Sequence, residues 1–164
     1  MNYSNNSQIA FIENNITDYR TLIQNIPTDI EVVLLDSTQN GLQQIADYLS
    51  LKSSHSIDTI HLLSHGANAQ LDLGTLNLNA DNLNQYTDLL NKIGNSLTEN
   101  GDILLYGCNV SEDSKGINFV QKLAQFTQAD IAASQNITGQ GGDWILEKNI
   151  GQITSPFLFL NTFN

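Results

Sequence analysis

Hydrophobic positions in this chain follow two patterns: short continuous apolar runs, and longer stretches with apolar residues three or four positions apart. The first pattern predicts strands covered on both faces, and the second predicts amphipathic helices. The predicted strands span residues 8–13, 30–36, 56–64, 101–107 and 129–134. The predicted helices span residues 17–26, 40–52, 80–97 and 114–128. Strands and helices therefore alternate along most of the chain.

Two further segments have the patterns of small hairpins. Residues 69–79 form two alternating runs around Gly74, and residues 144–147 with 151–155 form a pair that we expect at the sheet edge. The alternation of strands and helices predicts an α/β fold, a three-layer α/β/α sandwich with a mostly parallel sheet. The 164 residues suit a single domain over 1–164, with a disordered start at 1–7 and an apolar tail at 157–164.

Two predicted strands each end at a residue whose side chain can act as an acid, a base or a nucleophile. The run "TIHLLSHG" ends at His65-Gly66, and "DILLYGCNV" continues into Cys108, the only cysteine of the chain. Active sites of parallel sheets lie at the carboxyl ends of strands, and strands joined by one crossover are usually neighbours. We therefore expect His65 and Cys108 to face each other across one cleft.

These two ends contain the groups that covalent acyl transfer needs. An imidazole such as His65 activates a thiol by taking its proton. Gly66 lets its backbone N–H approach a substrate carbonyl, and the N–H of Cys108 is a second oxyanion donor. Gly107 allows the sharp turn that would point the sulfur out of the sheet. Nucleophile, base and oxyanion hole are thus all present.

Other interpretations of the same residues are open. A lone cysteine that closes an apolar strand is most often a small core residue. His61 and His55 are alternative bases, although we expect His61 to be buried and structural. A zinc set of Cys108, His65 and His61 lacks the usual ligand spacing. Calcium could bind the Asp- and Asn-rich turns, but without the spacing of a calcium loop, so no cofactor and no metal is predicted.

The strand ending in "SHG", followed by a strand ending in a small residue and cysteine, resembles the caspase-like (clan CD) superfamily of cysteine peptidases. The resemblance covers roughly residues 8–135 and implies a caspase-like sheet with flavodoxin-like strand order. It places the catalytic histidine on His65, the nucleophile on Cys108 and the oxyanion glycine on Gly66. The implied activity is that of a cysteine endopeptidase with a Cys-His dyad and an acyl-enzyme.

The substrate pocket departs from the caspase pattern. The residue two positions before the nucleophile lines the specificity pocket in caspases, and here it is Tyr106, neither acidic nor an amide. We therefore assign Tyr106 and Asp143 to the pocket only as candidates and predict no cleavage preference. Asp130 and Asp102 are further carboxylates that the sequence does not assign.

A second likeness covers nearly the whole chain. The segments "HLLSHG", "LLYGCNV", "LAQFTQADIAAS" and "TGQGGDWILE" resemble an uncharacterised domain near the N-terminus of very large bacterial, often cyanobacterial, adhesin-like surface or secreted proteins. The resemblance implies an extracellular or cell-surface location, with export that needs no N-terminal signal, or a cytoplasmic one if the chain stands alone. It implies a polypeptide substrate in cis, the parent or a neighbouring chain. The alternative is a catalytically inactive binding or assembly module.

The charge composition limits the classes of binding partner that we expect. The net charge is −11, from 17 Asp and Glu against 6 Lys and Arg. This balance disfavours nucleic acid and anionic membrane surfaces, both of which require basic residues. The sequence shows no secretory signal peptide and no apolar run of ~20 residues, so we predict no membrane insertion. It does not determine the oligomeric state.

Overall fold

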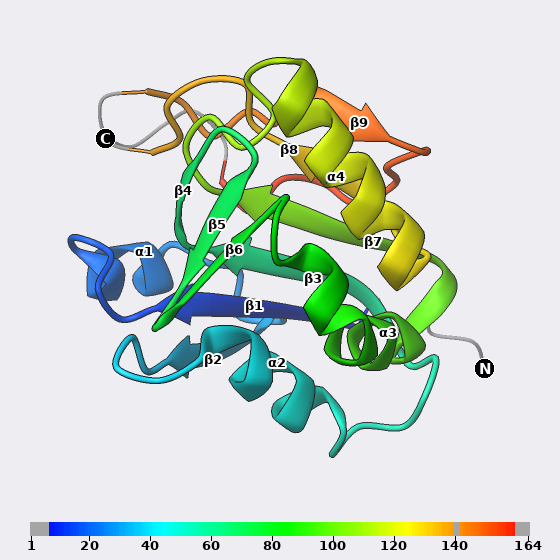
Figure 1. The fold of residues 1–164 in the computed structure, drawn as a ribbon. Coiled ribbons are helices and arrows are strands. Elements are labelled where there is room, and N and C mark those ends of the chain that lie inside the picture. Colours follow the sequence, from blue (N-terminus) through cyan, green and yellow to red (C-terminus); the bar gives the residue numbers. More distant parts are fainter. Residues whose placement is uncertain (1–6, 140–141, 160–164) are drawn as a thin grey trace.

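A six-stranded sheet forms the centre of this computed structural model, which describes residues 7–139 and 142–159 (Figure 1). The strand order is β2-β1-β3-β7-β8-β9. The bounds are β1 (Gln8–Glu13), β2 (Glu31–Leu35), β3 (Ile57–Leu63), β7 (Leu97–Tyr106), β8 (Asp130–Ala133) and β9 (Lys148–Ile150). All neighbours pair in parallel except β9, which runs antiparallel to β8. The parallel strands thus have the flavodoxin-like order, and the predicted α/β sandwich is confirmed.

Helices and chain segments cover both faces of the sheet. One face packs against α2 (Gly41–Leu49), α3 (Thr87–Asn95) and α4 (Ser114–Thr127), with a short 3-10 helix, η1 (Leu83–Tyr86), before α3. The other face is covered by α1 (Tyr19–Gln24) and by the segments on either side of β9, residues 144–146 and 153–159. Within β1, Ile9 and Phe11 join the first core while Ala10 and Ile12 join the second. Because both faces are buried, the strands are apolar almost throughout, which made them readable from sequence.

A small antiparallel sheet stands on the carboxyl end of the main sheet. It consists of β4 (His65–Ala67), β5 (Gln70–Leu73) and β6 (Leu76–Asn79), in that order. The predicted hairpin around Gly74 is confirmed. Gly74 has a φ of 64°, and a Cβ there would lie 1.8 Å from the Gln39 carbonyl oxygen, so only glycine fits this turn. The sequence did not predict β4, which starts at His65.

Three predicted elements have different limits in the structure. The helix expected over 80–97 is divided into η1 and α3, and β7 already begins at Leu97. The edge hairpin at 144–147 and 151–155 is wrong, because the edge carries one strand, β9. Trp144 and Leu146 pack instead on the second core. Burial of these side chains orients the segment toward the sheet face.

The ends of the chain are described only in part. Leu158 and Phe159 are buried in the second core, so the start of the predicted tail packs on the sheet. Residues 160–164 and most of the segment expected to be disordered, residues 1–6, lie outside the described residues. No helix within 7–139 or 142–159 has the length and apolarity needed to cross a bilayer.

Candidate active site

Strand register brings the strand ends that carry His65 and Cys108 together. β3 and β7 are parallel neighbours, and Leu63 pairs with Tyr106 at the last position of their ladder. His65 and Cys108 each follow two residues later, so both leave the carboxyl edge of the sheet at the same level. The predicted adjacency of these strand ends is therefore confirmed.

Glycines allow the two ends to pack with their backbones close together. A Cβ on Gly66 would lie 2.9 Å from Val110 Cγ2 and 3.3 Å from the Cys108 carbonyl oxygen. A Cβ on Gly107 would lie 3.6 Å from the Cα of Gly66. The turn continues through Asn109, which has a left-handed φ of 58° and donates its N–H to the Asn136 carbonyl at 2.8 Å. Gly66 thus has a packing role besides its predicted oxyanion role.

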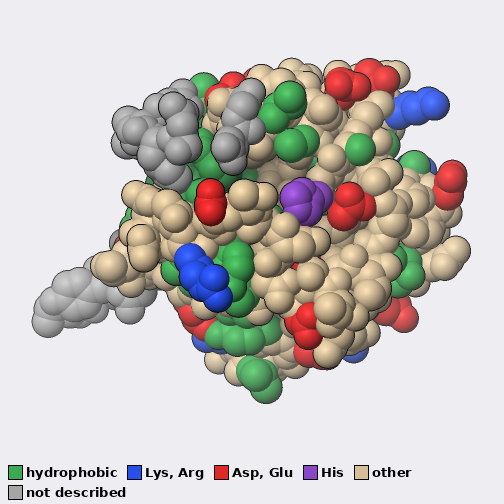
Figure 2. Space-filling model, turned by 90° about the vertical axis from the view of Figure 1, so that its left-hand side faces the viewer, with side chains coloured by type: hydrophobic (Ala, Val, Ile, Leu, Met, Phe, Trp, Pro, Cys, Tyr) green, Lys and Arg blue, Asp and Glu red, His purple; other side chains and the backbone are tan. Residues whose placement is uncertain are grey.

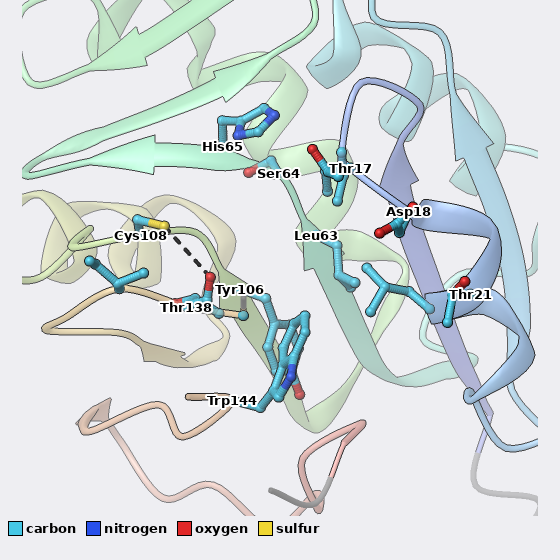
Figure 3. A pocket seen from close by; sticks show the side chains of 14 residues that line it. Thr17, Asp18, Thr21, Leu63, Ser64, His65, Tyr106, Cys108, Thr138 and Trp144 are labelled. Carbon is cyan, nitrogen blue, oxygen red and sulfur yellow. Dashed lines mark hydrogen bonds between the residues drawn. The ribbon is translucent and has the colours of Figure 1, made fainter. Parts of the chain in front are cut away.

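A pocket of about 330 Å³ opens between these ends and α1 (Figure 3). His65 and Cys108 lie on its wall, the thiol on one side and the imidazole above it. The floor and walls combine apolar and small polar side chains. The lining residues are Ile16, Thr17, Asp18, Thr21, Leu22, Leu63, Ser64, His65, Tyr106, Cys108, Ile137, Thr138, Gly139 and Trp144.

The His65 ring is exposed and held by a backbone carbonyl. Its Nε2 lies 3.2 Å from the Asn15 carbonyl oxygen, in the loop after β1. A carbonyl only accepts hydrogen bonds, so Nε2 is the protonated nitrogen. In the neutral ring Nδ1 is then unprotonated and able to accept a proton. Asp72 lies directly opposite His65 in the β4–β5 ladder, where its carboxylate accepts from Asn77 at 2.6 Å.

The Cys108 thiol is half-buried and makes its contact on the other side of the pocket. Its Sγ donates to the Thr138 carbonyl oxygen at 3.7 Å, drawn as the dashed line in Figure 3. The Thr138 hydroxyl in turn donates to the Gly107 carbonyl at 3.2 Å. These two described side chains, Cys108 and His65, form no hydrogen bond with each other. Proton transfer from this thiol to His65 would require the thiol to leave the Thr138 carbonyl.

Tyr106 lines the pocket with its ring and turns its hydroxyl into the core. The hydroxyl accepts from the Leu158 N–H at 2.8 Å and lies 3.4 Å from His61 Nδ1, while His61 Nε2 lies 2.7 Å from Gln8 Oε1. Burial lowers the pKa of His61 to about 3 and raises the pKa of Tyr106. His61 is therefore a neutral structural residue, as predicted. It is neither the candidate base nor a member of a zinc-ligand set with Cys108.

The candidate carboxylates lie away from the reactive pair. Asp143 does not line the pocket, because its side chain accepts from the Ile145 N–H at 3.1 Å and from Asn136 Nδ2 at 3.3 Å within its own loop. Asp102 and Asp130 pair across β7 and β8 at the opposite end of the sheet. Burial and the charge of Asp102 raise the pKa of Asp130. Asp102 precedes Cys108 by six positions, which corresponds to about 20 Å of extended chain.

Two polar residues that sequence reasoning missed lie close to His65. Ser64 is 5% exposed, lines the pocket, and its hydroxyl has no hydrogen-bond partner among the described residues. Glu13 is fully buried, and neither carboxylate oxygen has a well-formed hydrogen bond there. Burial raises the pKa of Glu13, and the backbone of Gly74 and the charge of His65 oppose this only in part. The signal for Glu13 was an acidic residue closing the apolar run "QIAFIE".

Comparison with known proteins bears on the whole of this architecture. A family model described as a domain of unknown function (DUF4347) matches residues 9–163. The chain belongs to the DUF4347 family. The match takes in the main sheet except for the first residue of β1, together with all residues that line the pocket, so the site described above is that of a DUF4347 domain. A search of curated proteins gave no match. The predicted likeness to an uncharacterised domain is confirmed to this extent, whereas the caspase-like and adhesin-like associations stay predictions.

Proposed function

We propose that this DUF4347 domain is a cysteine endopeptidase with Cys108 as nucleophile and His65 as general base and acid. The observation that supports it most is the position of both residues, at the ends of adjacent parallel strands on the wall of one pocket. The resemblance of the "SHG" and "GC" strand ends to caspase-like peptidases supports the same reading.

The first half of the reaction forms an acyl-enzyme. His65 Nδ1 removes the thiol proton after the sulfur leaves the Thr138 carbonyl, and the Asn15 carbonyl stabilises the imidazolium through Nε2–H. The thiolate adds to the scissile carbonyl carbon, and the oxygen takes the negative charge. Backbone N–H groups of Gly66 and Cys108 stabilise that oxyanion. The imidazolium then protonates the leaving amine as the C–N bond breaks.

The second half restores the enzyme. His65 takes a proton from water, the hydroxide attacks the thioester carbonyl, and the thiol leaves with the proton that His65 returns. The products are a carboxylic acid and an amine. The adhesin-like resemblance supports a substrate in the parent polypeptide or a neighbouring surface protein.

A second candidate function is that of an inactive binding module. It is favoured by the contact of the Cys108 thiol with the Thr138 carbonyl, which leaves the sulfur unpaired with imidazole. In that case the pocket would bind a peptide without cleaving it.

Thiol alkylation and peptide hydrolysis separate the two functions. For a peptidase, iodoacetamide at pH 6.5 should alkylate Cys108 faster than it alkylates free cysteine, and His65→Ala should lower peptide hydrolysis by about 100-fold or more. Cys108→Ala should abolish hydrolysis. His55→Asn is the matched control, because Asn tolerates the left-handed φ of 57° at that distant turn. Hydrolysis that survives Cys108→Ala, or alkylation that requires denaturant, would refute the peptidase.

A further inference from the structure

The pocket beside Cys108 has a reactive end and a charged end. Figure 3 shows Cys108 and His65 at one side and Asp18 and Thr21 at the opposite side, with Leu63 between them. A side chain that enters beside the sulfur would therefore cross an apolar stretch before it meets a carboxylate. One end of the pocket therefore carries the thiol and the imidazole, and the other end carries a carboxylate.

The middle of the pocket is apolar and buried. Leu22, Leu63 and Tyr106 are all buried to within 8% exposure and belong to the second core. Trp144 closes the wall, with its ring centroid 4.5 Å from that of Phe159 and 6.2 Å from that of Tyr106. Such a floor suits an aliphatic stem and offers little hydrogen bonding along its length.

Asp18 is the only acidic residue among the described residues that line the pocket, and no Lys or Arg lines it. Asp18 precedes α1 with a left-handed φ of 58°, and its side chain does not cap that helix. Figure 3 shows its carboxylate directed toward the cavity. No hydrogen bond or ion pair of this carboxylate is formed with the part of the chain that the structure describes. Its charge is thus available to a ligand.

The reactive end holds an unsatisfied polar group as well. The Ser64 hydroxyl is buried, lacks a partner among the described residues, and lies between His65 and Cys108 on the pocket wall in Figure 3. Buried hydroxyl groups normally have a hydrogen-bond partner, and rotation of the Ser64 side chain about χ1 would let a bound molecule supply the one that is missing here. A peptide backbone at the scissile bond would bring such a group.

We infer that the pocket receives a Lys or Arg side chain from the residue that precedes the scissile bond, with Asp18 as the specificity-determining residue; this inference rests on the proposed peptidase function. The aliphatic stem lies on the apolar floor, the cation meets the Asp18 carboxylate, and the Ser64 hydroxyl bonds the substrate backbone. An acidic side chain is disfavoured, because the Asp18 carboxylate repels it and no Lys or Arg lines the pocket to pair with it.

The charge of the whole molecule favours the same substrates. The chain has a net charge of −11, and Figure 2 shows acidic side chains scattered over an otherwise mostly uncharged face on the side where α1 and β4 lie in Figure 1. A negative field of this kind increases the rate at which cationic segments arrive and decreases that of anionic ones.

The test compares four fluorogenic peptides that differ only in the residue before the scissile bond: Arg, Lys, norleucine and Glu. Norleucine keeps the stem of lysine without its charge. We expect kcat/KM for Arg and Lys to exceed that for norleucine roughly tenfold and Glu to be the poorest, as one accessible ion pair allows. Asp18→Asn should remove the advantage of Arg and Lys and change norleucine less than twofold. Asp29→Asn, an exposed acid outside the pocket, should change nothing.

Failure of the specificity and failure of the peptidase give different results. Equal cleavage of norleucine and Lys, or an unchanged preference in Asp18→Asn, refutes the inference while hydrolysis that depends on Cys108 upholds the peptidase. If no peptide is cleaved, the peptidase is refuted, and NMR titration of the Cys108→Ala chain with Nα-acetyl-arginine amide tests the pocket. Shifts at Asp18 and Thr21 that Nα-acetyl-norleucine amide does not produce uphold the binding of a cationic side chain beside Asp18, without its place at a scissile bond; their absence overturns the whole inference.

Discussion

The buried histidine beneath the pocket predicts a measurable dependence of stability on pH. His61 is fully buried, and burial lowers its pKa from 6.5 to about 3. Between these two values the unfolded chain binds a proton that the folded chain does not. The contribution of His61 to the free energy of unfolding is therefore fully present above pH 6.5 and decreases as the pH falls toward 3.

The magnitude follows from the separation of the two pKa values. Each pH unit below 6.5 removes about 1.4 kcal/mol, so acidification from pH 7.5 to pH 5.0 should cost about 2 kcal/mol through His61 alone. pH 5.0 also keeps the protein above its isoelectric point of about 4.2. Glu13 acts in the opposite direction, because its raised pKa favours the folded state on acidification. The effect of His61 must therefore be measured against a variant.

Urea unfolding of the wild type and of His61→Gln at the two pH values isolates this term. Gln has an oxygen that can accept from Tyr106 and an amide that can donate to Gln8, but it does not titrate. We expect the wild type to lose about 2 kcal/mol more than the variant on acidification, even if the variant is less stable at both pH values. His55→Asn should follow the wild type. Parallel losses in the wild type and His61→Gln would refute the argument from burial.

Three further substitutions test other parts of the site. Tyr106→Phe should lower the free energy of unfolding by about 1–3 kcal/mol in urea titrations, because the buried N–H of Leu158 loses its acceptor; an unchanged midpoint would contradict this. Gly66→Ala forces its Cβ against the turn at Cys108, and the backbone displacement should cost about 1–3 kcal/mol in stability. The displaced turn should slow alkylation of the Cys108 thiol about tenfold or more; alkylation at the wild-type rate would count against the close packing. Glu13→Met replaces an unpaired buried carboxylate and should stabilise the fold by about 1–3 kcal/mol at pH 8. Because the pKa of Glu13 is raised, this gain should shrink as the pH falls toward 4.5, and a gain independent of pH would exclude the charge as its cause.

The fold was predictable because its information is local. Strands buried on both faces must be apolar at successive positions, as residues 9–12 and 103–106 are. The limits of elements were less predictable, since they depend on contacts between distant segments. At the N-terminal side of β7, for example, Leu97 pairs with Ile57 before the ladder shifts its register, and a helix would otherwise continue there.

The meeting of His65 and Cys108 at one edge of the sheet was predictable for a different reason. His65 and Cys108 are rare residue types that end apolar runs, and parallel strands place their ends at one edge. The groups around His65 and Cys108 cannot be recognised from the sequence in this way. The Asn15 group that holds His65 is a backbone carbonyl, which every residue possesses, and Asp18 looked like an ordinary helix-start residue.

The sequence by itself therefore determined the order of strands and helices, the layered class of the fold and the two side chains at the carboxyl edge, because hydrophobic period and residue type are written along the chain. Only the tertiary structure decided which loops meet those side chains. Sheet order sets the loop after β1 beside β3 and brings residues 137–139 over the end of β7. The depth of the pocket, its charge and the hydrogen-bond partners of His65 and Cys108 arise from contacts between segments far apart in sequence, which no local pattern records.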